Sequence, residues 1–183
     1  MKMPSILMLC TGNAARSVMG EVVLQSMRPD LVVSSAGTLA IEGQPLSIRT
    51  RNALEHIEMQ VPFHHRSREL TSQDVDSADL IVAMAREHVR YVRRHYPTAA
   101  PRTAVLKWLV EELPAGLEPL NQRVGQLNIE RVDLDEMQDV IDPADPVGIT
   151  MPSNVNRIEV EMRAYVECAL EIRDLITKLE SRL

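Results

Sequence analysis

Residues 5–17 read Ser5-Ile6-Leu7-Met8-Leu9-Cys10-Thr11-Gly12-Asn13-Ala14-Ala15-Arg16-Ser17. The apolar run Ile6–Leu9 predicts a buried strand, and the small residues after Cys10 predict a loop that leads into a helix from Ser17. Gly12 and Asn13 tolerate positive φ, so the chain can curl between the strand and the helix. Such a curl turns successive backbone N–H groups inward, toward the positive end of the helix. These residues therefore predict a binding loop for a dianion such as phosphate.

Two reactive side chains belong to this loop. Arg16 follows Cys10 at the spacing C-x5-R, so its planar guanidinium can return over the loop amides and grip two oxygens of a tetrahedral anion. The same positive groups stabilise a thiolate, which is the nucleophilic form of cysteine. A cysteine after an apolar strand is, by itself, more often a small core residue. Its combination with Gly12, Asn13 and Arg16 favours a nucleophile.

The segment from Cys10 to Ser17 resembles the signature of the low-molecular-weight protein tyrosine phosphatases. Further blocks at 34–38, 65–68 and 78–84 follow in the order of that family. The resemblance implies a hydrolase of phosphotyrosine or other phosphomonoesters that works through a cysteinyl-phosphate, with Cys10 and Arg16 catalytic. The substrate would be a phosphorylated protein or a small phosphomonoester. The implied phosphate-binding residues are Thr11, Gly12, Asn13, Ala14, Ala15, Arg16 and Ser17.

A general acid is also needed, because a leaving alkoxide or phenoxide must gain a proton. Two Asp-Pro pairs offer a carboxyl group, Asp142-Pro143 and Asp145-Pro146. The apolar residues before Asp142 resemble the family's approach to the acid, and those after Asp145 resemble its continuation. We favour Asp145 and keep Asp142 as the alternative. Either aspartate, taken singly, also fits an acidic turn.

Departures from the family pattern leave other activities open. Ile41 and Val147 stand where the family has aromatic walls for a phosphotyrosine ring, which weakens the preference for tyrosine. Relatives that hydrolyse phosphoarginine carry threonine at the position of Ala14, so that alternative is less attractive. An arsenate reductase that uses an external small thiol is the main rival class. An internal thiol relay is disfavoured, because Cys168 is the only other cysteine.

Length and composition set broader limits. A chain of 183 residues with 45% apolar residues predicts one domain over 1–183, with a polar, helix-prone insert around 115–137. We expect this insert to form an extra helix and loop near the phosphate loop. The net charge of −6 disfavours nucleic-acid binding. No apolar run reaches the roughly 18 residues of a membrane span, and no signal peptide is evident, so we expect a cytoplasmic protein without membrane association. The sequence suggests no metal site and no cofactor, and it carries no signal for an oligomeric state.

Strand and helix patterns alternate along the chain. Strands are predicted at 6–9, 31–34, 80–84 and 104–106, and helices at 18–27, 45–59, 86–96, 108–113 and 156–183. The alternation predicts a doubly wound α/β fold with a mostly four-stranded parallel sheet and a ligand site at the carboxyl ends of the strands. The resemblance implies that Ser35 hydrogen-bonds Asn13. We expect the 86–95 helix to carry a solvated basic face, the 156–183 helix to have an apolar side that includes Ile158, and Cys168 to be a core thiol.

Overall fold

The predicted α/β alternation is present in the computed structural model, which describes residues 3–143 and 156–183. The sheet contains β1 (Ser5–Cys10), β2 (Val32–Gly37), β3 (Leu80–Ala83) and β4 (Thr103–Val105). All three strand pairings are parallel, in the order β2-β1-β3-β4. The strand β2 continues past the predicted end at Ser34, because its pairing with β1 extends to the partners Cys10 and Gly37.

Seven α-helices connect and cover these strands within the described residues. They are α1 (Arg16–Met27), α2 (Ile48–His56), α3 (Ser72–Ser77), α4 (Arg86–His95), α5 (Leu106–Glu112), α6 (Leu120–Gly125) and α7 (Arg157–Glu180). The helix α2 is shorter than predicted, because Pro45 pairs with Arg66 in an isolated bridge and Ser47 caps the helix by accepting the Thr50 N–H. Among these residues, no helix is both long and apolar enough to cross a membrane.

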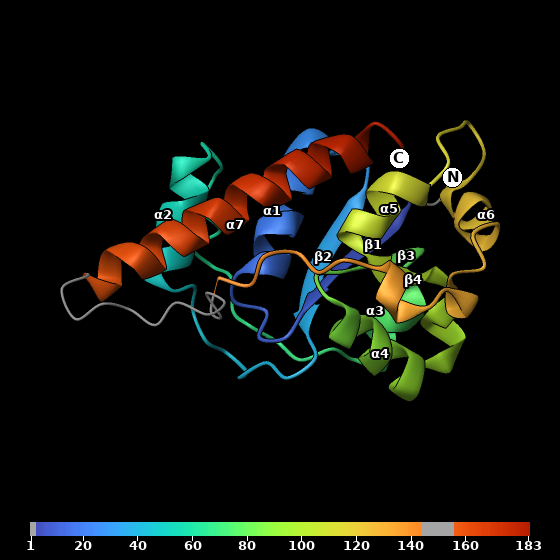
Figure 1. Cartoon of the computed structure of the whole chain (residues 1–183), viewed down its shortest axis with the longest axis horizontal. Helices are drawn as coiled ribbons and strands as arrows, with labels where there is room; N and C mark the ends of the chain where they lie inside the picture. Colours follow the sequence, from blue (N-terminus) through green and yellow to red (C-terminus); the bar gives the residue numbers. More distant parts are fainter. Residues whose placement is uncertain (1–2, 144–155) are drawn as a thin grey trace.

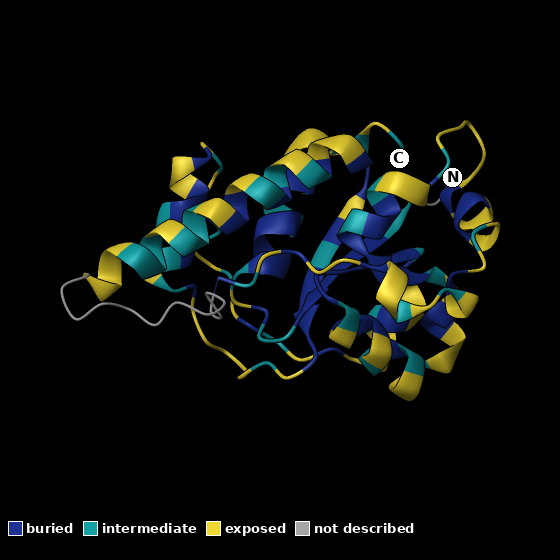
Figure 2. Cartoon of the chain, viewed as in Figure 1, coloured by how far each residue is buried: buried dark blue, intermediate teal, exposed yellow. Residues whose placement is uncertain are grey.

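The two faces of the sheet are covered by different helices (Figure 1). Side chains alternate along β1, so Ile6 and Met8 join the core under α1, α2, α5 and α7, whereas Leu7 and Leu9 pack with α3 and α4. The strands are almost wholly buried between these layers (Figure 2). Cys168 is buried in the α7 core, as predicted, but Ile158 in the first turn of α7 is 67% exposed and does not belong to the apolar face.

The segment 115–137 lies apart from the place that the sequence suggested. We expected an extra helix near the phosphate loop, but α6 lies with Met3 and Pro4 beside the amino end of β1, at the opposite end of the sheet. Arg123 holds this segment to the end of α7 by donating to backbone oxygens of Pro114, Glu118 and Leu183. The chain then returns toward the carboxyl ends of the strands, where the Val140 N–H donates to the Met84 carbonyl.

Gly37 allows β2 to end directly against the loop after β1. A Cβ atom at this position would lie 2.5 Å from the Thr11 carbonyl oxygen and 2.9 Å from the Asn13 nitrogen, both backbone atoms. We expect Gly37→Ala to displace the loop and to lower the free energy of unfolding by about 1–3 kcal/mol in urea denaturation. Gly125→Ala is the control, since its Cβ would meet nothing within 4 Å. Equal stability of the two variants would contradict the close approach.

Candidate functional site

The loop between β1 and α1 is held by hydrogen bonds to its own carbonyl groups. The Thr38 N–H donates to the Cys10 carbonyl and the Leu39 N–H to the Thr11 carbonyl, each at 2.9 Å. His65 Nε2 donates to the Asn13 carbonyl and Thr50 Oγ1 to the Ala14 carbonyl, also at 2.9 Å. A peptide's N–H points away from its C=O, so carbonyls fixed outward leave the amides free to line the inside of the curl. The loop that the sequence predicts after β1 is thus present, and four of its carbonyls are bonded to the segments around it.

Asn13 organises the curl from within the protein. Asn13 is buried, and its backbone has the left-handed conformation, with φ of 49°. Gly12 does not have positive φ, so of the two residues only Asn13 provides the left-handed turn of the predicted curl. Its Nδ2 donates to Ser35 Oγ at 2.8 Å and to Ser17 Oγ at 3.2 Å. Its Oδ1 accepts the Arg68 N–H at 3.0 Å. The predicted bond between Asn13 and Ser35 is therefore confirmed.

Cys10 is the last residue of β1, and its thiol lies at the base of the loop. Its Sγ is 3.0 Å from Ser17 Oγ, in the first turn of α1. Because Ser17 Oγ already accepts a bond from Asn13 Nδ2, its own proton is available to the sulfur. The positive end of α1 points to the same place. These contacts would stabilise negative charge on the sulfur.

Arg16 begins α1, at the other end of the loop from Cys10, and its buried guanidinium contacts Asp142. Arg16 Nη2 is 2.7 Å from Asp142 Oδ2. The Asp142 backbone is brought here by the two residues before it: the Val140 N–H donates to the Met84 carbonyl, and the Ile141 N–H donates to Glu171 Oε2. Asp145, the other acid candidate, lies outside the described residues. Among the described aspartates, Asp142 is thus placed at the loop.

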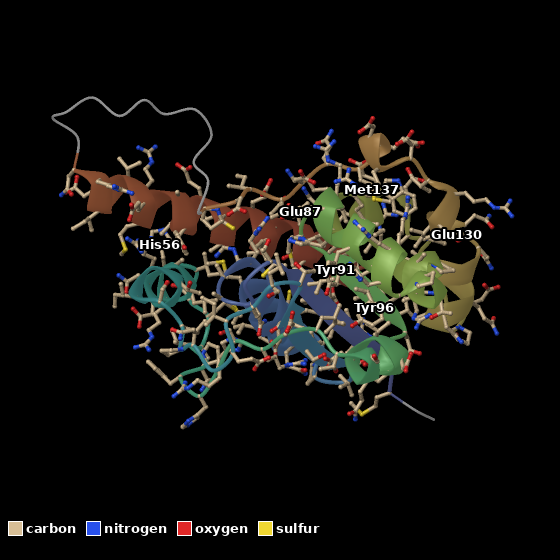
Figure 3. All side chains as sticks on the ribbon, turned by 90° about the horizontal axis from the view of Figure 1, so that it is seen from below. His56, Glu87, Tyr91, Tyr96, Glu130 and Met137 are labelled. Atoms are coloured by element: carbon tan, nitrogen blue, oxygen red, sulfur yellow. The ribbon has the colours of Figure 1, made fainter. Side chains whose placement is uncertain are left out.

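A cavity of about 560 Å³ opens beside this ion pair. It is lined by Arg16, Ala85, Arg86, Glu87, Arg90, Asp139, Val140, Ile141 and Asp142. Arg86 Nε is 3.3 Å from Asp139 Oδ1, and the Arg86 N–H also donates to that oxygen at the start of α4. In Figure 3, the labelled Glu87 and Tyr91 mark successive turns of α4. Three carboxylates and three guanidinium groups therefore surround the entrance on the α4 side.

Exposed aliphatic side chains occur on the segment that follows β2. Leu39 and Ile41 are 70% and 71% exposed, and the Leu39 backbone is bonded to the loop at Thr11. Ser67 Oγ donates to the Ile41 carbonyl at 2.6 Å and fixes this segment from behind. Ile41 is thus an exposed aliphatic side chain on this segment, whereas Val147, the other expected wall residue, lies outside the described residues.

His88 is a buried residue of the site that sequence reasoning missed. The 86–95 segment was expected to expose a basic face, yet His88 is only 1% exposed. Its Nδ1 accepts the Ala85 N–H at 3.0 Å, and its Nε2 is 3.0 Å from Thr11 Oγ1. Burial, with a smaller effect of the Arg16 charge, lowers its pKa from 6.5 to about 3. The helical spacing of His88 with Val92 on the buried side of α4 was the available signal.

Cys168 lies in α7 behind the site. Its thiol donates to the Ile141 carbonyl at 3.3 Å, and burial raises its pKa to about 12. It is therefore a protonated thiol at neutral pH and a poor nucleophile. No group of three or more potential metal ligands occurs among residues 3–143 and 156–183.

The low pKa of His88 predicts how the free energy of unfolding depends on pH. Between about pH 6.5 and 3 the unfolded chain binds a proton at His88 that the folded protein does not bind. The contribution of neutral His88 is complete above pH 6.5 and is lost as the pH falls toward 3. We expect His88→Gln to remove up to about 1.4 kcal/mol per pH unit from the acid dependence of the free energy of unfolding in this range. Identical slopes in urea denaturation for both proteins would argue against a buried neutral imidazole.

Comparisons with known proteins match this geometry. The sequence profile of the family described as low molecular weight phosphotyrosine protein phosphatase matches residues 5–117. Protein-arginine-phosphatase of Geobacillus stearothermophilus is 31% identical over 139 residues, which are 75% of this chain and 90% of that protein. Low molecular weight protein-tyrosine-phosphatase Etp of Escherichia coli (strain K12) is 32% identical over 116 residues, 62% of this chain and 78% of Etp.

Solved structures agree in fold. The low molecular weight protein tyrosine phosphatase from T. tengcongensis has a TM-score of 0.70 and 29% identity, with 98% of this chain and 99% of that chain covered. The YwlE arginine phosphatase from Geobacillus stearothermophilus has a TM-score of 0.70 and 25% identity, with 97% and 90% covered. The chain belongs to the low molecular weight phosphotyrosine protein phosphatase family, in which its relatives include phosphatases named for tyrosine and for arginine.

Proposed function

We propose that Cys10 is the nucleophile of a phosphatase reaction in which the 11–17 loop and Arg16 bind the phosphoryl group. The observation that carries this proposal is the position of Cys10 Sγ, 3.0 Å from Ser17 Oγ at the base of a loop whose carbonyls are fixed outward. The inward amides can donate to the phosphoryl oxygens, and Arg16 adds a bidentate charge-assisted contact. Thr11, Gly12, Asn13, Ala14 and Ala15 contribute through the backbone in this proposal.

The first chemical step transfers the phosphoryl group to sulfur. The Cys10 thiolate attacks phosphorus in line, an S–P bond forms, and the bond from phosphorus to the leaving oxygen or nitrogen breaks. The Ser17 hydroxyl stabilises the thiolate before attack. The loop amides and Arg16 hold the three equatorial oxygens, where charge redistributes in the transition state. Their positions are set before the substrate arrives, so little reorganisation is needed.

We propose Asp142 as the general acid for this step. The sequence pattern favours Asp145, whereas the 2.7 Å contact with Arg16 supports Asp142. Incoming phosphate competes with the Asp142 carboxylate for Arg16. In the proposed step Asp142 takes up a proton from solvent and passes it to the leaving oxygen or nitrogen as the bond from that atom to phosphorus breaks. In the second step the Asp142 carboxylate takes a proton from water, the water oxygen attacks phosphorus, and the S–P bond breaks to release inorganic phosphate and the Cys10 thiolate.

The substrate class is either phosphotyrosine or phosphoarginine in a protein, or a small phosphomonoester. The relatives include phosphatases named for each of the two amino acids. The carboxylates of Glu87, Asp139 and Asp142 at the cavity are balanced by the same number of guanidinium groups, so the charge of the lining favours neither leaving group. Ala14 lacks the hydroxyl expected of a phosphoarginine enzyme. Hydrolysis of matched phosphotyrosine and phosphoarginine peptides decides between the two by the ratio of kcat/KM values.

Arsenate reduction with an external thiol is the alternative reaction. The buried, protonated Cys168 gives no support to an internal thiol relay. A phosphatase assay run beside thiol-coupled arsenate reduction tests the two reactions on the same preparation. Arsenate turnover without release of phosphate from aryl phosphates would replace the proposed function.

Removal of the nucleophile and of the guanidinium fork should separate chemistry from folding. We expect Cys10→Ser to reduce kcat for an aryl phosphate by at least about a thousandfold, and Arg16→Lys by about a hundredfold, with unchanged circular dichroism. Arg94→Lys, on the exposed side of α4, is the matched control and should keep wild-type kinetics. Substantial turnover in Cys10→Ser would exclude the mechanism.

The identity of the acid should appear in the dependence on the leaving group. We expect Asp142→Asn to slow phenyl phosphate about a hundredfold more than dinitrophenyl phosphate, because a good leaving group departs without a proton. Asp145→Asn is the paired variant and should affect both substrates alike. The measurement is kcat for a series of aryl phosphates. The same pattern in Asp145→Asn, and not in Asp142→Asn, would assign the acid to Asp145.

A further inference from the structure

A buried imidazole connects the phosphate loop to the start of α4. His88 Nδ1 accepts the Ala85 N–H at 3.0 Å, so this nitrogen carries no proton. The neutral ring therefore bears its proton on Nε2, which lies 3.0 Å from Thr11 Oγ1. Desolvation keeps the ring neutral at physiological pH. The tautomer is thus fixed by a backbone group, and the Nε2–H donates to Thr11 Oγ1, the nearer of two acceptors, with Glu87 Oε1 at 3.3 Å.

The hydrogen bond from His88 to Thr11 is followed by a second one, from Thr11 to Glu87. The Thr11 hydroxyl oxygen accepts the His88 Nε2–H, and its own proton is donated to Glu87 Oε1, 3.1 Å away. The Thr11 carbonyl accepts the Leu39 N–H from the opposite side. Thr11 is therefore held through its side chain by α4 and through its backbone by the segment after β2. Thr11 directly follows Cys10, so its orientation sets the first amides of the cradle.

We propose that His88 is a positioning residue, which acts through the Thr11 hydroxyl to fix the phosphate-binding conformation of the loop. This role rests on the proposed function of the loop and adds to it a residue outside the Cys10–Ser17 segment. His88 does not contact the phosphoryl group. It ties the cradle to α4, whose first turn also lines the cavity beside Arg16.

The two ring nitrogens have different tasks, and two substitutions can separate them. Ala85 has no side-chain oxygen for capping, so Nδ1 of His88 satisfies the N–H at the start of α4. An asparagine oxygen can replace Nδ1 but cannot reach Thr11. A glutamine amide nitrogen can replace Nε2 but provides no acceptor at the Nδ1 position. His88→Asn therefore keeps the cap and loses the loop contact, and His88→Gln does the reverse.

The test measures loop function and stability in these two variants. For His88→Asn we expect a five- to tenfold higher inhibition constant for inorganic phosphate, a matching loss of kcat/KM for an aryl phosphate, and a Tm near that of the wild type. For His88→Gln we expect phosphate inhibition within about twofold of wild type and a Tm lowered by about 2–4 °C. His95→Asn, on the same helix and exposed, is the control for the substitution itself.

A double-variant cycle tests whether the effect passes through Thr11. Thr11→Val should weaken phosphate inhibition as much as His88→Asn does, whereas Thr11→Ser, which keeps the hydroxyl, should have wild-type phosphate inhibition. The double variant Thr11→Val with His88→Asn should bind phosphate no more weakly than Thr11→Val alone. Additive losses would overturn the proposal. So would a phosphate affinity that falls in His88→Gln and holds in His88→Asn, because His88 would then act only as a helix cap.

Amide hydrogen exchange provides a readout that does not depend on the reaction. We expect faster exchange of the 11–15 amides in His88→Asn than in the wild type, and wild-type exchange in His88→Gln. If the wild type neither binds phosphate nor hydrolyses aryl phosphates, the proposed function fails, whereas the exchange pattern still decides the positioning role. Unchanged exchange of these amides in His88→Asn would reject that role.

Discussion

The outward anchoring of the loop carbonyls is the constraint on which the site depends. An anion cradle made of backbone amides has no side chains to fix it, so its shape is set by what holds the other side of each peptide. Here Thr38, Leu39, Thr50 and His65 supply those donors from three separate segments. The sheet and α2 therefore serve the loop as well as the core. Gly37 belongs to the same constraint, because only a residue without Cβ fits against Thr11.

The polar groups behind the loop form two chains of hydrogen bonds in which the donor and the acceptor of each bond are defined. Asn13 donates to both Ser17 and Ser35, which leaves the Ser17 proton for Cys10. His88 donates to Thr11, whose hydroxyl then donates to Glu87. Both chains begin at a group whose donor role is unambiguous, an amide in one case and an imidazole with a capped Nδ1 in the other. The Asn13 bonds are buried and hold one conformation, because any rotation leaves a polar atom without its partner, whereas the bond from Thr11 to Glu87 is exposed.

The α4 side of the site brings Asp142 and several other charged side chains close to Arg16. Asp142 reaches Arg16 because the chain after Met137 pairs with Met84 at the end of β3. The same return places Asp139 at the start of α4, where it meets Arg86. The segment after β2 carries the exposed aliphatic side chains of Leu39 and Ile41, and the Leu39 backbone is bonded to the loop at Thr11. The charged side chains therefore belong to the α4 side of the loop.

The sequence alone determined the fold class, the order of strands and helices, and the loop from Cys10 to Ser17, because these depend on local periodicity and on residues close together in the chain. It also predicted the contact between Asn13 and Ser35 through the family resemblance. Only the tertiary structure revealed His88 and Thr50 at the loop, the opposite location of α6, and the contact between Asp142 and Arg16. Those depend on how segments more than 30 residues apart fold against one another, and no local pattern of residues encodes the direction in which a buried polar side chain points.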